Sequence, residues 1–179
     1  MKPATLEAIK TTREVMLKKY PEYSNLEAGE RVLLCMAYLA DAVKPREDRG
    51  NNRGQWVDCF LDAAGVPPGN PWCASALTFA CKVAGVDCPS GAAAVRNWRI
   101  WFGDKGKDWT EPKRGRVAMK NSGGGKGHIG IVVKVIGPMV YSIEGNTSPG
   151  ENGSQRDGDG LYRRVRLKRF WSWGFGELR

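Results

Sequence analysis

The sequence predicts an α+β fold built around one main core. Apolar residues recur at helical spacing up to Gly103, and beyond it their period falls to about two, which is typical of strands. Helices that come first and strands that come afterwards favour an antiparallel sheet. The length of 179 residues, of which 41% are hydrophobic, suffices for one core and is too short for two comfortable domains.

The helical half is divided by start and stop signals. Pro21 ends the first amphipathic segment, and Ser24 with Glu27 has the spacing of a capping box at the start of the second. Gly65 ends the third segment, and Pro71 is suited to the first turn of the fourth. The expected helices are residues 5–20, 24–43, 55–65, 73–85 and 90–103.

The strand half has the pattern of a small sheet with one tight hairpin. Gly137 and Pro138 lie between two apolar runs and predict the turn of that hairpin. The polar, glycine-rich segments 121–127 and 148–160 are expected to be loops. The expected strands are residues 114–120, 128–136, 139–146 and 161–171.

Five cysteines and a single histidine limit the chemistry of the chain. An odd number of cysteines without close pairs excludes a complete disulfide framework, so we expect reduced thiols. No C-x-x-C pair occurs and only one imidazole is present, so we expect no metal site and no cofactor.

The net charge of +9 predicts a polyanionic partner. Basic residues crowd the segments 113–126 and 161–171. No nucleic-acid-binding signature accompanies them, so we expect no specific nucleic-acid partner, and basic residues that alternate along a strand commonly form a solvated face. The anionic polymers of a bacterial envelope would be attracted to the same surface, and salt would weaken that attraction.

Cys73 stands at the expected beginning of a helix, directly after Pro71 and Trp72. Only a thiolate attacks well, and the unpaired N–H groups and dipole of a helix N-terminus stabilise negative charge. The alternative is a small buried side chain, which is the ordinary role of a free cysteine. That role fits the cysteines that lie in or beside apolar helices, namely Cys35, Cys59, Cys81 and Cys88.

The single histidine, His128, follows a glycine-rich segment and precedes an apolar strand. A lone histidine is more often structural, but a thiol and an imidazole that each lie at the end of an element have the general pattern of a nucleophile and its base. Such a pair needs a third group that orients the ring. Glu144 and Asn146 share one face of the neighbouring strand, and the hairpin brings that strand beside His128.

The register of the hairpin decides whether these side chains meet. A strict two-residue loop at Gly137 and Pro138 would place His128 and Glu144 on opposite faces of the sheet. An odd-length loop or a β-bulge restores a common face. We therefore predict such an irregularity in the hairpin.

Three stretches carry a resemblance to a known family. "PWCASALTFACKVAG", "GHIGIVVKV" and "SIEGN", in this order and separation, resemble the cysteine, histidine-dependent amidohydrolase/peptidase (CHAP) family, within the papain-like superfamily that also holds the NlpC-type cell-wall peptidases. The resemblance covers residues 50–147 and includes features of bacterial and phage members. It implies a papain-like fold, with a catalytic domain over residues 46–179 and an N-terminal helical extension over residues 1–45.

The resemblance also implies roles for individual residues. Cys73 would be the nucleophile and His128 the base, with Glu144 and Asn146 as the polar partners of the imidazole. The implied reaction is hydrolysis of amide bonds in bacterial peptidoglycan, in which the thiolate attacks a carbonyl and His128 protonates the leaving amine. The bond that is cut, between sugar and peptide or within the peptide, stays open.

Further expectations concern the rim of the site. Asn70 is a candidate donor to the oxyanion, Trp72 is a candidate for substrate contact, and Trp109, in a loop, is a candidate for a cleft wall. The other tryptophans are expected mostly in the core. Gly115 and Arg116 stand where members of the family commonly have Gly-Asp, and this departure bears on substrate specificity.

Two other classes of protein remain open. A thiol amidase or protease with a substrate outside the wall would use the same residues, and a nonenzymatic wall- or nucleic-acid-binding module would account for the charge. We expect a monomer without a membrane span, because the longest apolar runs are about half of the roughly 20 residues that a spanning helix needs. The first residues lack the apolar core of a signal peptide, so we expect a cytoplasmic protein that reaches the wall by lysis or delivery, as a phage endolysin does.

Overall fold

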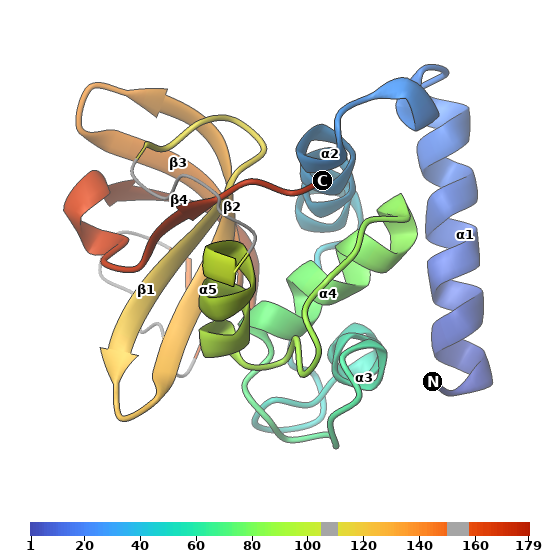
Figure 1. Cartoon of the computed structure of the whole chain (residues 1–179). Helices are drawn as coiled ribbons and strands as arrows, with labels where there is room; N and C mark the ends of the chain where they lie inside the picture. Colours follow the sequence, from blue (N-terminus) through green and yellow to red (C-terminus); the bar gives the residue numbers. More distant parts are fainter. Residues whose placement is uncertain (105–110, 150–157) are drawn as a thin grey trace.

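The computed structural model of the chain describes residues 1–104, 111–149 and 158–179. Within these residues it confirms the α+β fold, with helices gathered on one side of an antiparallel five-stranded sheet (Figure 1). The helices are α1 (Pro3–Lys19), α2 (Ala28–Tyr38), α3 (Gln55–Ala63), α4 (Cys73–Ala84) and α5 (Val95–Asp104). The strands are β1 (Val117–Gly123), β2 (Lys126–Ile136), β3 (Met139–Thr147), β4 (Gly160–Leu167) and β5 (Gly174–Gly176).

Helix α4 is the centre of the helical layer. It packs against α2 and α3 and also against β2 and β3 of the sheet, and nearly all of its residues are buried. A helix that is apolar on all sides needs such surroundings, because it has no face suited to water. Gly85, in the left-handed conformation, ends it. The first residue of α4, Cys73, is therefore held at a defined place beside the sheet.

The sheet has the strand order β4-β3-β2-β1-β5, and every neighbouring pair is antiparallel. Alternate residues face opposite sides: Ile129 and Ile131 belong to the main core beneath the helices. Val132 and Val140 belong to a second, smaller cluster, in which Trp171 covers the other face. Both faces of the central strands are therefore packed.

The irregularity predicted for the β2–β3 hairpin is confirmed as a β-bulge. The register shifts between Val132 and Lys134, so Gly130 lies opposite Glu144. Because residues two apart share a face of a strand, His128 lies on the same face as Gly130 and Glu144. The extra residue lies within the strand and not at the turn, where the two-residue loop is kept.

The N-terminal extension packs into the main core. Met16 of α1 is fully buried in the same cluster as α4. Arg13 donates hydrogen bonds of 2.7 Å to the carbonyl oxygens of Lys82 and Val83, at the C-terminal end of α4. The extension and the rest of the chain share one core, and the boundary between them stays a prediction. None of the helices in the described part of the chain is long and apolar enough to cross a membrane.

Two helix starts differ from expectation. The capping box of Ser24 and Glu27 is wrong: Tyr23–Asn25 form a separate short 3-10 helix, so α2 begins only at Ala28 and has no side-chain cap. Helix α5 begins at Val95 and not at residue 90. The residues just before Val95 form a turn instead, because Gly91 has a positive φ and its carbonyl accepts a hydrogen bond from the Asn97 side chain.

The strands also differ from expectation in their bounds, and there are five of them in the described residues instead of four. β1 and β2 extend into segment 121–127 and turn at Gly124 and Gly125, which both have positive φ. The last expected strand ends at Leu167, and the chain then forms a 3-10 turn and the short strand β5. The early extension of β2 places His128 inside a strand.

Candidate active site

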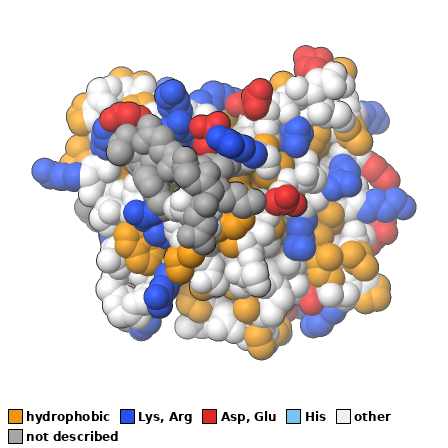
Figure 2. Space-filling view, in the orientation of Figure 1, with side chains coloured by type: hydrophobic (Ala, Val, Ile, Leu, Met, Phe, Trp, Pro, Cys, Tyr) orange, Lys and Arg blue, Asp and Glu red, His pale blue; other side chains and the backbone are white. Residues whose placement is uncertain are grey.

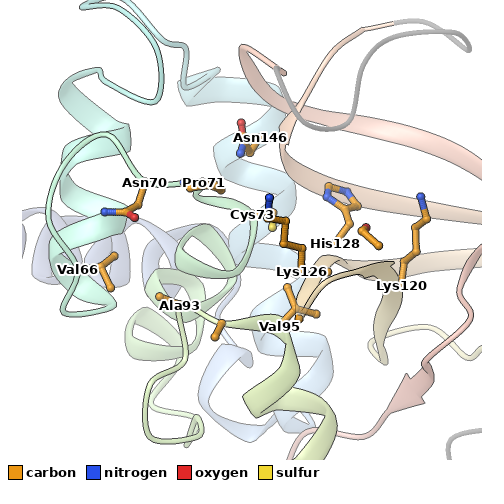
Figure 3. Close-up of a pocket in the computed structure, with 14 residues that line it drawn as sticks. Val66, Asn70, Pro71, Cys73, Ala93, Val95, Lys120, Lys126, His128 and Asn146 are labelled. Atoms are coloured by element: carbon orange, nitrogen blue, oxygen red, sulfur yellow. The ribbon is translucent and has the colours of Figure 1, made fainter.

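Cys73 and His128 meet at one cavity of about 630 Å³. Cys73 is the first residue of α4, and His128 is near the start of β2; both are buried, with 7% and 3% of their surfaces exposed. Figure 3 shows both side chains at this cavity. Cys73 lies close enough to His128 to raise the pKa of the imidazole. The structure thus brings together two residues that are 55 positions apart in the sequence.

The imidazole of His128 is held from two further directions. Its Nε2 lies 2.7 Å from Oε2 of Glu144 on β3. The ring of Trp171 stacks on it, with centroids 6.2 Å apart and an angle of 18° between the planes. With Nε2 directed to Glu144, the other ring nitrogen, Nδ1, is left for the exchange of a proton with Cys73.

The protonation of the pair follows from burial and these contacts. Burial lowers the pKa of His128, but hydrogen bonds with Cys73 and Glu144 and their negative charges outweigh it and raise the pKa to about 9. Burial raises the pKa of Glu144, but contacts with His128 and Arg166 outweigh it and lower the pKa to about 2. Near neutral pH the site therefore holds an imidazolium beside a carboxylate.

Glu144 is fully buried and accepts hydrogen bonds on both oxygens. Oε1 accepts from the Ser142 hydroxyl at 2.6 Å and from Arg166 Nε at 3.2 Å. Oε2 lies against His128 and accepts from Arg166 Nη2 at 2.8 Å. These four hydrogen bonds, made by three residues, occupy the roughly four lone-pair positions of a carboxylate.

Asn146 lines the same cavity but has a different position from Glu144. It is buried and adopts the left-handed conformation, with φ of 52°, which asparagine tolerates better than most residues. Its Oδ1 has no hydrogen-bond partner among the residues that the structure describes. Glu144 is therefore the side chain that contacts the imidazole, and Asn146 presents its amide to the cavity.

The walls of the cavity differ in chemistry. One wall is small and apolar and comes from the turn before α4 and the start of α5, namely Val66, Pro71, Ala93, Ala94 and Val95. The β1–β2 hairpin contributes Lys120, Ser122 and Lys126 (Figure 3). None of the described residues that line the cavity is acidic. The cavity therefore favours an anionic or neutral ligand with small apolar groups.

The three rim residues expected from the sequence have different outcomes. Trp72 is fully buried and donates its indole N–H to Glu47 at 2.9 Å, so the expected contact with substrate is wrong. Asn70 lines the cavity, and its side-chain amide donates to the carbonyl of Pro67 at 2.9 Å, which fixes the turn before α4. Trp109 lies outside the described residues.

The other cysteines have surroundings unlike that of Cys73. Burial raises the pKa of Cys35 and of Cys81, and both thiols are fully buried. Burial also raises the pKa of Cys59. A hydrogen bond with Cys81 lowers the pKa of Cys88, which is half-buried. Cys73 alone among the five lies at the cavity with the imidazole.

The basic C-terminal segment is only in part the solvated face that its sequence indicates: Arg163, Lys168 and Arg169 are exposed, but the other two arginines are not. Arg164 and Arg166 are buried, with 4% and 8% of their surfaces exposed, whereas the apolar Val165 and Leu167 between and after them are exposed. The physical reason is the buried carboxylate of Glu144, which requires a cation nearby. Figure 2 shows Lys and Arg side chains interspersed with acidic ones over the visible face.

Sequence reasoning did not find three side chains of this site: Ser142, Trp171 and Arg166. A usable signal was present for Arg166. If Glu144 is buried, its negative charge must be paired, and the neighbouring strand is the one rich in arginine. Gly115 and Arg116, which depart from the Gly-Asp of the family, do not line the cavity. Arg116 instead pairs with Glu177 at 3.1 Å.

Comparisons with known proteins assign this chain to no family. A scan against protein-family models, a search of curated proteins and a search of solved structures found no match. Among the described residues, no group of three or more histidine, cysteine or acidic side chains is placed to hold a metal ion.

Proposed function

We propose that this chain is a cysteine peptidase or amidase that hydrolyses amide bonds of bacterial peptidoglycan. The observation that carries the thiol chemistry is the contact series from Cys73 through His128 to Glu144 beside an open cavity. Acyl transfer through a thiol requires a nucleophile, a base and a group that orients the base. The wall substrate is supported by the resemblance of the Cys73, His128 and Glu144 motifs to the CHAP family.

The proposed mechanism assigns one task to each group. The Cys73 thiolate attacks the amide carbonyl, and the N–H groups at the start of α4 receive the oxyanion. His128 gives a proton to the leaving amine, and a thioester on Cys73 results. His128 then takes a proton from water, which attacks the thioester and releases the acid. Glu144 stays ionised throughout and holds the imidazolium.

The papain-like architecture belongs to the same proposal. A buried helix that begins with the cysteine and packs against an antiparallel sheet bearing the histidine is the arrangement that the resemblance implies. The placement of α4 against β2 and β3 supports it. Asn146 fits a polar partner that faces the substrate, because its amide borders the cavity while Glu144 contacts the ring.

The cavity supports a short anionic peptide as the bound part of the substrate. Its small apolar wall suits small side chains, and Lys120 and Lys126 suit a free carboxylate. A nonenzymatic basic module is less well supported, because Arg164 and Arg166 are buried and so are withheld from an external polyanion. Delivery from the cytoplasm to the wall by lysis, as for an endolysin, is part of the same proposal.

Digestion of purified peptidoglycan, followed by mass spectrometry of the soluble fragments, tests this function. We expect new amine and carboxyl ends with the wild-type protein and none with Cys73→Ala, and the masses identify the bond that is cut. A protein substrate such as casein, treated in parallel, tests the rival with a substrate outside the wall. Cleavage of casein without cleavage of peptidoglycan would contradict the proposed substrate, and equal products from Cys73→Ala would contradict the mechanism.

A further inference from the structure

Arg166 lies next to the site but does not line the cavity. On β4 it pairs across from Val140, so it shares the sheet face with Glu144 and His128. Its guanidinium donates through Nε and Nη2 to the two oxygens of Glu144, which is the two-pronged geometry that matches a carboxylate. Only 7% of the Arg166 side chain and none of the Glu144 side chain is exposed.

The guanidinium is itself held in place on its flat side. It lies over the ring of Phe170, 4.7 Å from the centroid. Phe170 meets Trp171 edge to face at a centroid distance of 4.9 Å, and Trp171 stacks on His128. Two residues hold the imidazole, Glu144 by a hydrogen bond and Trp171 by stacking. Arg166 contacts Glu144 directly and is connected to Trp171 through Phe170.

We infer that Arg166 is the positioning residue of the site: it fixes Glu144 in one orientation, and through Glu144 it fixes the tautomer and direction of the His128 ring. With Ser142 and Arg166 on the remaining lone pairs, Glu144 offers His128 one acceptor on Oε2. That acceptor requires a proton on Nε2. The nitrogen that gains and loses a proton against Cys73 is then always Nδ1.

The inference rests on the proposed function, but its test needs no substrate. The rate at which iodoacetamide alkylates Cys73, measured from pH 4 to 9, reports the thiolate directly. In the wild-type protein Glu144 stays ionised in acid because Arg166 and His128 lower its pKa to about 2. The charged and titratable groups that surround the imidazole and its carboxylate are Cys73, Lys120, Lys126, Glu144, Arg164 and Arg166.

Arg166→Met keeps an unbranched apolar stem and removes the guanidinium with its charge and both hydrogen bonds to Glu144. The buried Glu144 then loses a cation, its pKa rises, and in mild acid it becomes neutral and no longer holds the imidazolium. We expect the acid limb of the alkylation profile to move upward by about one pH unit, so that the rate at pH 6 falls about tenfold. Arg166→Lys keeps the charge without the two-pronged geometry and should recover part of this loss.

Arg164→Met is the matched control. Arg164 is equally buried on the same strand, but it donates to the backbone carbonyl of Ser148 and not to Glu144. Its replacement removes a nearby charge but no hydrogen bond to Glu144, so it should lower the melting temperature and move the alkylation profile clearly less far than Arg166→Met. Ser142→Ala, which removes one donor to Glu144, should move the profile in the same direction as Arg166→Met and less far.

The possible results distinguish a failure of the positioning role of Arg166 from a failure of the proposed function. An unmoved profile in Arg166→Met, or an equal shift in Arg164→Met, would overturn the positioning role while fast Cys73 alkylation still supported the thiol site. If Arg166→Met does not fold, as judged by circular dichroism, Arg166→Lys and Ser142→Ala carry the test, and no shift in either overturns the inference. A wild-type Cys73 that iodoacetamide does not modify would overturn the proposed function and this inference together.

Discussion

The surroundings of the cysteines predict which thiol reacts. Cys73 faces the cavity and the imidazolium, whereas burial raises the pKa of Cys35, Cys59 and Cys81. Cys88 is the internal competitor, because its hydrogen bond with Cys81 lowers its pKa. Labelling with iodoacetamide at neutral pH and peptide mapping should show Cys73 modified first and Cys88 second. Modification of Cys88 ahead of Cys73 would count against the nucleophile.

The pair of His128 and Glu144 predicts how stability depends on pH. Folding raises the pKa of His128 from 6.5 to about 9, so its stabilisation is complete below about pH 6.5 and is lost as the pH rises towards 9. Folding lowers the pKa of Glu144 from 4.5 to about 2, so its stabilisation is lost as the pH falls from 4.5 towards 2. The stabilisation from this pair is therefore greatest between about pH 4.5 and 6.5.

Urea unfolding at pH 6.5 and 8.5 tests this dependence. The free energy of unfolding should fall by something on the order of 2 kcal/mol between these values in the wild-type protein. His128→Asn cannot become charged and should lose most of that fall. The same fall in both proteins would show that another group titrates.

At the scale of elements, the close approach of β2 and β3 sets the position of Glu144. Gly130 lies opposite Glu144, and a Cβ at Gly130 would come within 2.8 Å of Glu144 Cγ and 2.9 Å of the carbonyl oxygen of Ile143. Gly130→Ala should therefore displace the carboxylate, lower the free energy of unfolding by about 1–3 kcal/mol and slow the alkylation of Cys73.

Gly29→Ala is the control for that substitution. A Cβ at Gly29 would meet the carbonyl oxygen of Gly115 at 2.5 Å, and neither of these residues lines the cavity. It should destabilise the protein by a similar amount and leave the alkylation rate of the folded protein unchanged. Equal slowing in both variants would mean that the rate reports general stability and not the position of Glu144.

Local patterns predicted the elements well where each signal is local. The α+β order and the cysteine at the start of α4 follow from periodicity and spacing, which neighbouring residues determine. The bulge of the β2–β3 hairpin was expected for a different reason, because only an irregular register places His128 and Glu144 on one face. The start of α2 does not follow its local signal: Ser24 and Glu27 have capping spacing, but Tyr23 is buried and starts a separate turn instead. Packing in three dimensions decided against the local signal there.

The inward direction of Arg166 could not be read from its own strand. In β4 basic and apolar residues alternate, and alternation alone places the apolar set inside. Over Arg164–Leu167 the opposite holds, because the face of β4 next to Glu144 needs a positive charge more than Val165 needs burial. The meeting of Cys73, His128 and Glu144 was therefore predictable from the sequence, whereas the pairing of Arg166 with Glu144 could be found only by first assuming that Glu144 is buried.

At the scale of the whole molecule, the N-terminal helix is part of the fold that holds α4. Met16 is fully buried, while its neighbour Leu17 is 42% exposed. Met16→Ala should lower the free energy of unfolding by about 2–5 kcal/mol, and Leu17→Ala should change it by less than about 0.5 kcal/mol. Thermal melting of both variants distinguishes a packed helix from an appended one, for which both changes would be small.

The proposed mechanism requires that Cys73 forms a covalent acyl intermediate with a wall peptide. Soluble peptidoglycan fragments are mixed with the protein, the reaction is quenched in acid within seconds, and the intact protein and its peptides are weighed by mass spectrometry. We expect an added acyl mass on the peptide that contains Cys73, which hydroxylamine removes, and no such mass in Cys73→Ala. Cleavage of the fragments at an undiminished rate by Cys73→Ala, with no adduct on Cys73 in the wild-type protein, would contradict it.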